Sequence, residues 1–207
     1  MLKNTVFDIG RVMTGFEWND YVGRLFKDET VRSVVTAATF GNPLWQEMDR
    51  GVMQTDEIFK GMLDNAPDYE AEIREALDRV DECVERKAYA IPWIEELKAQ
   101  GYRVLFLSNY SEYVMSKSVH AFDFLEHMDG GVFSCDAKYI KPNEEIYRCL
   151  FDKYEIVPAE CVFIDDSPAN IETAQRLGMK GIVFENYEQA HAELIDIMSP
   201  FLYNILL

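Results

Sequence analysis

The sequence lacks several features that would mark whole classes of protein. No stretch reaches the roughly 18 consecutive apolar residues of a membrane span, so we expect no transmembrane helix. The opening MLKNTVFDIG has no small-residue cleavage site, which argues against a signal peptide and favours a cytoplasmic protein. The four cysteines form no C-x-x-C pair, and the three histidines show no zinc-ligand spacing. We therefore expect free thiols in a reducing compartment and no zinc site.

Positive charge is also scarce, with 20 Lys and Arg against 37 Asp and Glu and a formal net charge of -17. Such a chain repels polyanions, so we exclude nucleic acid as a partner. A phosphorylated substrate would need local positive charge from a metal ion or from a few chosen basic side chains. The length of 207 residues and the apolar content of 48% suit one globular domain, or one core with a modest insertion.

Helical periodicity without a convincing strand extends from about residue 21 to residue 86. The stretch is rich in Glu, Asp, Met and Ala, and Thr55 followed by two acidic residues is typical of a helix start. We predict helices there over 19–27, 29–38, 43–49, 55–65 and 69–86.

Short apolar strands flank this helical stretch. TVFDIG precedes it, and from about residue 88 onward strands alternate with helices. Near-continuous apolar strands in such alternation are typical of a parallel sheet with helices on both faces. We therefore predict an α/β, Rossmann-like core of residues 1–15 and 87–207, with a small helical cap inserted at 16–86. The later predicted strands are YRVLFLSN, GGVFSC, CVFIDDS and KGIVFEN, and 188–198 is the last predicted helix. The C-terminal PFLYNILL should dock on the body of the protein or on a partner chain.

Polar residues stand at three predicted strand ends and in the loop after the shorter strand. Ligands of open α/β sheets bind at the carboxyl ends of the strands, so we expect these residues to converge on one site. They are Asp8 with Gly10, Ser108 with Asn109, Asp165 with Asp166, and Lys141.

These residue types suit phosphoryl transfer. Carboxylates with a backbone carbonyl make a hard oxygen cage for Mg²⁺, and a lysine balances phosphate charge. A hydroxyl and backbone N–H groups hold phosphate oxygens, while a carboxylate facing a bound phosphate can act as nucleophile. Each motif alone also fits a structural role, such as a helix start at Ser167 and Pro168. Their order and their placement at strand ends together favour a functional site.

The set VFDIGRV, LFLSN, KP and VFIDDSPANI resembles the four ordered motifs of the haloacid dehalogenase-like (HAD) hydrolases, over essentially the whole predicted core. The helical insertion resembles that family's small cap, and WQEMDRGVMQTDEIF resembles a stretch common in capped members. The D-x-G form of the first motif is similar to bacterial phosphatases that act on α-D-glucose 1-phosphate. The resemblance implies a Mg²⁺-dependent phosphatase for a small phosphorylated metabolite. We expect a monomer or a homodimer.

Carried over by position, the resemblance implies that Asp8 is the nucleophile and a metal ligand, and that Gly10 gives its carbonyl to the metal. Asp166 would bind the metal directly, with Asp165 beside it as a ligand or through water. Asn170 would orient this acidic loop.

The same resemblance assigns phosphate binding to Ser108 and Asn109, and it gives Lys141 the neutralisation of both phosphate and nucleophile. Arg11 either reaches the substrate or lines the hinge of the cap. Arg50 either contacts a phosphate or sugar or has no role in the site. Two tryptophans stand in segments that can face the active-site cleft, Trp18 and Trp45.

The first motif departs from the family pattern. Most phosphatases of the family carry a second aspartate two residues after the nucleophile, which protonates the leaving oxygen and then activates water. Here that position is Gly10, so the carbonyl ligand is kept and the acid/base is lost. We therefore expect a leaving group that needs little protonation, such as the anomeric oxygen of a hexose 1-phosphate. Glu17 or a residue of the cap is a candidate substitute.

Two other functions stay open at this point. A halide-releasing dehalogenase would use an aspartate nucleophile on carbon and would need no metal, although the pair Asp165 and Asp166 argues against it. A weakly active or non-catalytic phosphate-binding homologue would keep the site but lack turnover, because Gly10 offers no acid/base. Magnesium dependence and multiple turnover distinguish these functions from a phosphatase.

Overall fold

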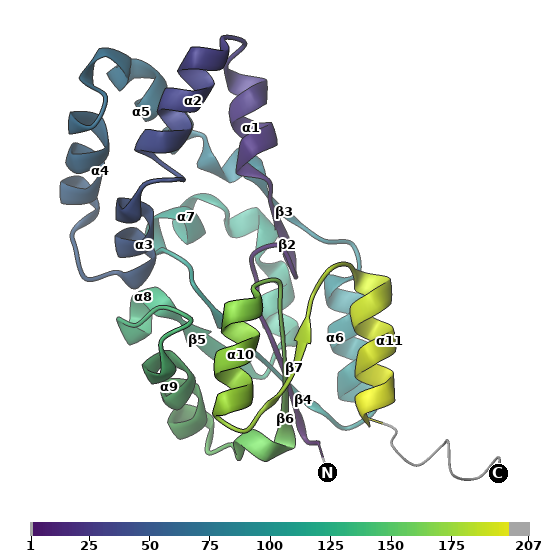
Figure 1. Cartoon of the computed structure of the whole chain (residues 1–207). Helices are drawn as coiled ribbons and strands as arrows, with labels where there is room; N and C mark the ends of the chain where they lie inside the picture. Colours follow the sequence, from purple (N-terminus) through teal and green to yellow (C-terminus); the bar gives the residue numbers. More distant parts are fainter. Residues whose placement is uncertain (1, 199–207) are drawn as a thin grey trace, which may run out of the picture.

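The computed structural model describes residues 2–198, and its centre is a five-stranded parallel sheet in the order β5-β4-β1-β6-β7 (Figure 1). The strands are β1 (Asn4–Phe7), β4 (Arg103–Ser108), β5 (Gly130–Phe133), β6 (Cys161–Asp165) and β7 (Lys180–Val183). Each of the five predicted strand segments supplies one of them. The predicted parallel α/β fold is therefore confirmed.

Alternate residues of the strands face opposite sides of the sheet, and helices cover both sides. On one side Phe7 packs edge-on against Trp93, with ring centroids 4.7 Å apart, and this side is covered by α6 (Ala90–Ala99) and α11 (Tyr187–Met198). On the other side Val6 lies in one apolar cluster with residues of α9 (Glu144–Tyr154) and α10 (Pro168–Arg176). Burial on both faces explains why the strands are apolar at nearly every position.

Shorter helices and turns complete the core. They are α7 (Glu112–Lys117), α8 (Ser134–Ala137), η3 (Val119–Ala121), η4 (Asp123–His127) and η5 (Pro158–Glu160).

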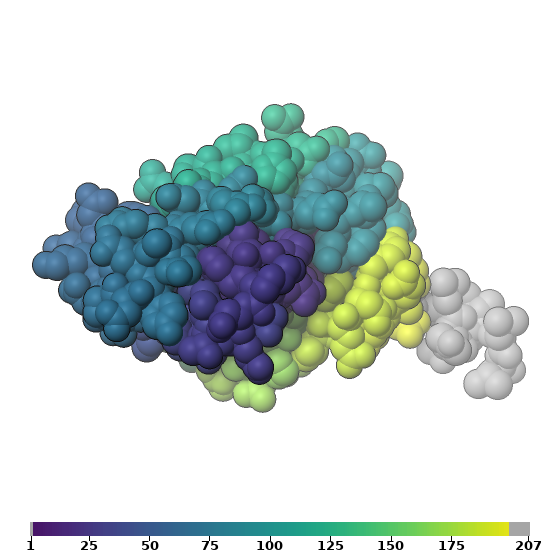
Figure 2. All heavy atoms as spheres, turned by 90° about the horizontal axis from the view of Figure 1, so that it is seen from above, coloured from purple at the N-terminus to yellow at the C-terminus, as the bar shows by residue number. Residues whose placement is uncertain are grey.

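The cap is a group of helices beyond the carboxyl ends of the strands (Figure 1). Seen from the cap side, its purple and blue atoms cover one end of the molecule and leave the yellow helix α11 uncovered beside them (Figure 2). Asp28 and Asn42 accept hydrogen bonds from backbone N–H groups at the starts of two of these helices, which fixes where they begin. The cap elements are α1 (Trp18–Leu25), α2 (Glu29–Ala38), α3 (Pro43–Arg50), α4 (Thr55–Asp64), η1 (Pro67–Tyr69), α5 (Glu70–Asp78) and η2 (Val80–Cys83).

A two-stranded antiparallel sheet joins the cap to the core. β2 (Thr14–Phe16) pairs with β3 (Val84–Arg86), and Thr14 stands opposite Arg86. The prediction of one helix over 69–86 without any strand is therefore wrong at its C-terminal end. The chain leaves α5 at Asp78, turns through η2 and pairs with a segment at the far end of the cap sequence, which local periodicity cannot reveal.

Several expectations about the whole chain can be compared with the structure. All four cysteines are free thiols. No helix within residues 2–198 is long and apolar enough to cross a bilayer. The C-terminal PFLYNILL lies outside the described residues, so its docking stays a prediction.

Close packing at Gly131 gives a test of the sheet. A Cβ atom added there would stand 2.3 Å from Cγ of Phe106 and 2.5 Å from the carbonyl oxygen of that residue. Neither the buried ring nor the sheet backbone can move freely, so Gly131→Ala should lower the free energy of unfolding by about 1–3 kcal/mol. Gly23→Ala in α1 is the matched control, because nothing lies within 4 Å of its added Cβ. It should raise stability by about 0.5–1 kcal/mol, since alanine favours the helix. Urea denaturation measures both, and equal effects would contradict this packing.

Candidate active site

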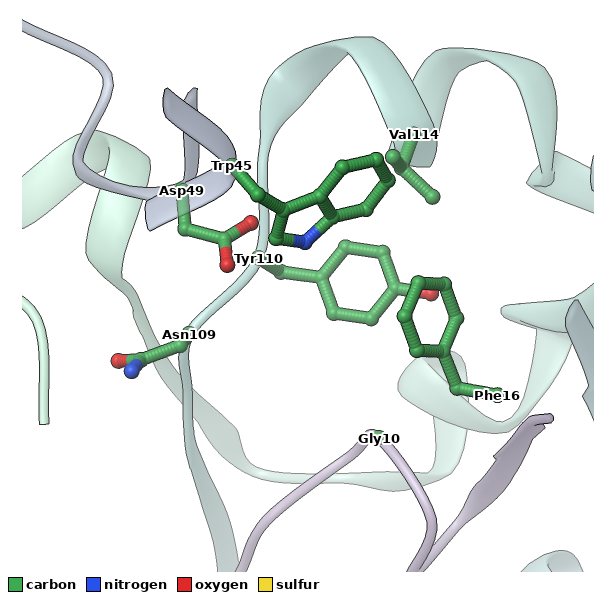
Figure 3. A pocket seen from close by; sticks show the side chains of 7 residues that line it. All are labelled: Gly10, Phe16, Trp45, Asp49, Asn109, Tyr110 and Val114. Carbon is green, nitrogen blue, oxygen red and sulfur yellow. The ribbon is translucent and has the colours of Figure 1, made fainter. Parts of the chain in front are cut away.

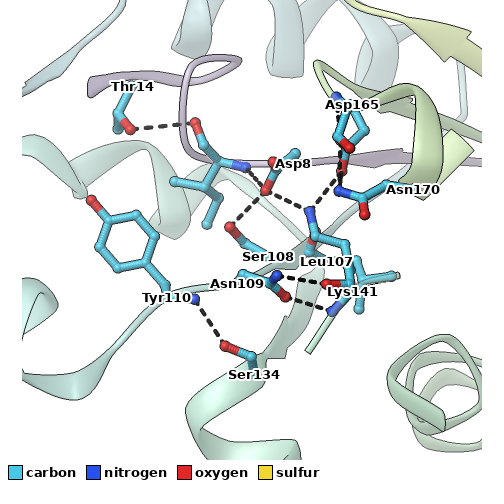
Figure 4. A network of polar contacts seen from close by, with 12 residues as sticks. Asp8, Thr14, Leu107, Ser108, Asn109, Tyr110, Ser134, Lys141, Asp165 and Asn170 are labelled. Atoms are coloured by element: carbon cyan, nitrogen blue, oxygen red, sulfur yellow. Dashed lines mark hydrogen bonds and ion pairs between the residues drawn. The ribbon is translucent and has the colours of Figure 1, made fainter. Parts of the chain in front are cut away.

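Lys141 forms a buried bridge between two aspartates from neighbouring strands (Figure 4). Its Nζ lies 2.8 Å from Oδ1 of Asp8 and 2.7 Å from Oδ2 of Asp165, and it also donates to the carbonyl of Leu107 at 2.9 Å. Lys141 is 4% exposed and Asp165 is 0% exposed, so solvent screens these charges little.

Asp8 uses only one of its two carboxylate oxygens in these contacts. Oδ1 accepts hydrogen bonds from Oγ of Ser108 at 2.7 Å and from the backbone N–H of Ile9 at 2.7 Å, in addition to the ion pair with Lys141. Among the described residues, no hydrogen bond or ion pair involves Oδ2. The carboxylate is thus fixed by one oxygen, while the other is available for a ligand or for attack.

The topology of the sheet explains why these groups meet. β1 lies between β4 and β6, and Phe7 is in register with Phe106 on one side and Ile164 on the other. The residues that follow, Asp8 and Asp165, are therefore neighbours at the carboxyl edge of the sheet. The expected convergence of strand ends is present in the structure.

Two side-chain amides hold the charged groups in place. Asn109 accepts a hydrogen bond from the backbone N–H of Lys141 at 2.7 Å and donates to its carbonyl at 3.0 Å. Asn170 donates to both carboxylate oxygens of Asp165, at 2.9 and 3.0 Å. Asn109 as a phosphate ligand stays a prediction, because its amide is already bonded to the Lys141 backbone.

Three carboxylates can each present one oxygen to a metal ion. The ligand oxygens of Asp8, Asp165 and Asp166 all lie within 4.8 Å of one another. Carboxylate oxygens are the hard donors that Mg²⁺ prefers. The oxygens of Asp165 already accept several hydrogen bonds, whereas Asp166 lies at the rim with Nη1 of Arg11 at 3.6 Å. The donor set fits Mg²⁺, with Asp8 and Asp166 as the freer ligands.

Burial and neighbouring negative charge both shift the protonation equilibria of this cluster. Burial raises the pKa of Asp8 to about 6, and the charge of Asp165 adds to this effect against the opposing charge of Lys141. Burial also raises the pKa of Asp166, again with help from Asp165. Although burial lowers the pKa of Lys141, the two bridged carboxylates raise it above its ordinary value. One lysine therefore does not neutralise three carboxylates, and a bound cation would relieve the imbalance.

A cavity of about 150 Å³ opens beside Gly10, where the cap meets the core (Figure 3). We call it the cap–core cavity. Aromatic rings form much of its wall, and those of Phe16 and Trp45 have centroids 5.8 Å apart. Trp18 does not line it and stacks on Phe40 instead, at 5.7 Å. The lining residues are Gly10, Phe16, Trp45, Asp49, Asn109, Tyr110 and Val114.

Other predicted candidates lie outside this lining. Arg11, with a φ of 61°, pairs with Asp166, and Arg50 lies 3.6 Å from Glu47 in its own helix. Glu17 lines two other pockets near the hinge. Substrate contacts of Arg11 and Arg50 stay predictions.

Asp49 is a member of this site that sequence reasoning did not single out. It is partly buried, and its carboxylate is turned into the cap–core cavity from α3 (Figure 3). Desolvation raises its pKa to about 7, and the charge of Asp8 adds to this against the backbone N–H of Ser111. The only sequence signal is an aspartate within WQEMDRG, in a polar helical stretch where acidic residues are common.

Comparison with known proteins identifies the family. A family model described as haloacid dehalogenase-like hydrolase matches residues 13–178. The chain belongs to the haloacid dehalogenase-like hydrolases. The matched part of this hydrolase includes Ser108, Lys141 and the two aspartates at the end of β6, and it begins after Asp8.

Relatives of this hydrolase align over most of its length. D-ribitol-5-phosphate phosphatase of Bacteroides thetaiotaomicron is 26% identical over 96% of this chain and 100% of its own. A sesquiterpene phosphatase of Aspergillus oryzae is 24% identical over 87% of this chain and 88% of its own. The crystal structure of a HAD family enzyme from Bacteroides thetaiotaomicron, in complex with magnesium and inorganic phosphate, is similar with a TM-score of 0.71. It is 19% identical and covers 92% of this chain and 99% of its own, which confirms the fold.

Removal of the bridging lysine should destabilise the protein, because Asp8 and Asp165 then lose their positive partner. Lys141→Met leaves two buried carboxylates without their cation, which should lower the free energy of unfolding by about 3–5 kcal/mol at pH 8. The loss should shrink toward pH 5, because Asp8 is then largely protonated in both proteins, its folded-state pKa being about 6 with Lys141 present and higher without the ammonium group. Lys27→Met, at an exposed lysine between α1 and α2, is the control and should change stability by less than about 0.5 kcal/mol. Denaturation of metal-free protein at both pH values measures this, and equal losses in the two variants would refute the bridge.

The pH dependence of stability should report on Asp49. Its pKa is about 7 in the folded protein against an ordinary 3.8, so between these values the folded state keeps a proton that the unfolded chain has released. Wild-type stability should therefore fall as pH rises from about 4 to about 7, relative to Asp49→Asn, which cannot titrate. The expected gap in metal-free protein is about 1–3 kcal/mol at pH 8 and near zero at pH 4. Asp8 and Lys141 are present in both proteins, so only the part of their titration that depends on the charge of Asp49 adds to this gap. A gap that does not change with pH would contradict a raised pKa.

Proposed function

We propose that this hydrolase is a Mg²⁺-dependent phosphatase that cleaves a small phosphomonoester through a phosphoaspartate on Asp8. The Asp8–Lys141–Asp165 bridge carries the proposal. A fixed carboxylate with one free oxygen, beside a buried ammonium group and two further carboxylates for a cation, suits attack on a phosphate group. Local cations are needed, because the chain as a whole carries a net charge of -17 and repels anions.

In the proposed reaction, Oδ2 of Asp8 attacks phosphorus and the bond to the leaving oxygen breaks. Ser108 and Lys141 hold Oδ1, so the attacking oxygen is oriented before substrate arrives. Water then attacks the phosphoaspartate, which releases phosphate and regenerates the carboxylate. Mg²⁺ held by Asp8, the carbonyl of Gly10 and Asp166, with Asp165 beside them, would neutralise charge on the phosphoryl oxygens.

The substrate that we propose is a sugar phosphate, such as a hexose 1-phosphate. The name of the Bacteroides relative gives it a phosphorylated sugar alcohol as substrate, which supports this class. Phe16 and Trp45 offer ring faces in the cap–core cavity against which a sugar ring can lie. The anomeric oxygen of a 1-phosphate also needs less protonation to leave than an ordinary alkoxide. We place the enzyme in the cytoplasm, as a monomer or a homodimer.

The two rival functions make different use of the same site. A dehalogenase attacks carbon and has no use for the cluster of Asp8, Asp165 and Asp166 as a metal site. A phosphate-binding protein without turnover would use that cluster, but it would stop after one phosphoryl transfer.

The proposal is tested by a screen of small phosphometabolites and 2-haloacids. Wild-type protein should hydrolyse at least one phosphomonoester over many turnovers with Mg²⁺ and should lose this activity in EDTA. Asp8→Asn should lower kcat by about 10³-fold or more, because an amide is a poor nucleophile. Asp152→Asn, at an exposed aspartate of α9, is the matched control and should keep wild-type activity.

Three outcomes would refute the proposal. Equal activity of Asp8→Asn would remove Asp8 as the nucleophile. Halide release from 2-haloacids in EDTA would favour the dehalogenase. A single burst of product without further turnover, across the whole screen, would favour the binding protein.

A further inference from the structure

The site as described has a nucleophile but no proton donor for the leaving group. Gly10 occupies the position from which most phosphatases of the family supply one. Of the seven residues that line the cap–core cavity, only Asp49 and Tyr110 carry a group that can exchange a proton. Burial raises the pKa of the Tyr110 phenol far above its ordinary value, so it releases no proton near neutral pH.

We propose that Asp49 of the cap is the acid/base residue of this enzyme, in place of the aspartate that the first motif lacks. The proposal rests on the phosphatase function proposed above and assigns its proton transfers. The carboxylate of Asp49 is turned into the same cavity that Gly10 lines (Figure 3), so a substrate bound at Asp8 and extending into the cavity meets it.

Contacts between α3 and α8 hold Asp49 at the cavity. Oγ of Ser134 donates a hydrogen bond to the backbone carbonyl of Asp49 and accepts one from the N–H of Tyr110 at 2.9 Å. Two residues further on, the carbonyl of Gly51 accepts a hydrogen bond from Nζ of Lys138 at 2.7 Å. The cap segment 49–51 is therefore bonded to the core at the carbonyl of Asp49 itself and again two residues after it.

Gly51 shows how close this contact is. A Cβ atom at this residue would stand 2.8 Å from the carbonyl oxygen of Cys135, and its φ of 68° is one that side chains rarely adopt. Backbone thus lies directly on backbone where the cap meets the core. Such a contact positions Asp49 through main-chain atoms, which vary less in position than side chains on a surface.

The space beside Gly10 is open. A Cβ atom there would have nothing within 4 Å, and the residue has no positive φ that demands glycine. Neither packing nor backbone conformation therefore excludes an aspartate at this position. The vacant volume forms part of the cap–core cavity, into which Asp49 projects from the opposite side.

The proton transfers balance over the two steps. As Asp8 bonds to phosphorus, the electron pair of the breaking bond passes to the leaving oxygen, which takes the proton of Asp49. In the second step water bonds to phosphorus and gives a proton to the Asp49 carboxylate. The bond between phosphorus and Asp8 breaks, its electron pair returns to the Asp8 carboxylate, and Asp49 is protonated again.

The test compares two aryl phosphates that differ in how much protonation their leaving group needs. Phenyl phosphate releases a basic phenolate, whereas 2,4-dinitrophenyl phosphate releases a weakly basic anion. Asp49→Asn should lower kcat/KM for phenyl phosphate by about 10²–10⁴-fold, because the proton donor is gone. It should change kcat/KM for 2,4-dinitrophenyl phosphate by less than about 3-fold, since the step up to release of the phenol needs no acid. With this second substrate kcat should still fall, with a burst of one dinitrophenol per enzyme, because water is no longer activated.

Three further variants control the test. Asp64→Asn removes an exposed carboxylate from the last residue of α4 and should leave both substrates unaffected. Asp49→Glu keeps a carboxyl group and should recover part of the phenyl phosphate activity. The double variant Gly10→Asp, Asp49→Asn places a carboxyl group in the open space beside Asp8 and should recover activity in the same way.

Each way in which the proposal can be wrong gives a different experimental result. Equal losses on both substrates would show that Asp49 only supports the fold or the binding of phosphate. Unchanged activity on phenyl phosphate would show that another group donates the proton. Thermal unfolding separates misfolding from chemistry, and a folded Asp49→Glu that recovers nothing would also overturn the proposal. If the phosphatase function itself is wrong, wild-type protein will show no Mg²⁺-dependent release of dinitrophenol that Asp8→Asn abolishes.

Discussion

The bridge that Lys141 makes between Asp8 and Asp165 is the interaction on which the rest of the site depends. It places one positive charge among three carboxylates, two of them buried, so the group is both fixed and short of positive charge. Each neighbour serves this arrangement, since Asn109 holds the lysine backbone and Asn170 holds the second aspartate. Because the carboxylates outnumber the lysine, the site can bind a cation. The bound cation then offsets their negative charge and allows an anionic phosphate group to bind.

Much of this arrangement could be predicted from sequence because it follows from local patterns. Apolar runs mark the strands of a doubly covered sheet, and polar residues at their ends mark the edge where ligands bind. Adjacent strands in the order β4-β1-β6 then bring Ser108, Asp8 and Asp165 together without further information. The side-chain contacts were not predictable in detail. The use of Asn109 to hold the Lys141 backbone depends on loop geometry that no periodicity encodes.

The parts that escaped prediction are those created by contacts between distant segments. β2 and β3 have three residues each, pair with each other, and are separated in sequence by the whole cap. Asp49 could not be predicted as a site residue for the same reason, since in sequence an aspartate of an acidic helical stretch looks like any exposed aspartate. Its enclosure arises where α3 meets α8, more than 80 residues away in sequence. Long-range docking, and not local composition, makes this carboxylate different from its neighbours.

The pairing of β2 with β3 also has a consequence for how such enzymes diversify. Because Thr14 and Arg86 stand opposite each other, the core chain is interrupted at two points that are neighbours in space. An inserted unit with adjacent ends can be enlarged, shortened or replaced without changing the order of the strands beneath it. Under the proposed function, the cap residues that contact the substrate can then change separately from the residues that transfer the phosphoryl group. An acid/base residue on the inserted unit would break that separation, since exchanging the cap would then exchange part of the chemistry as well.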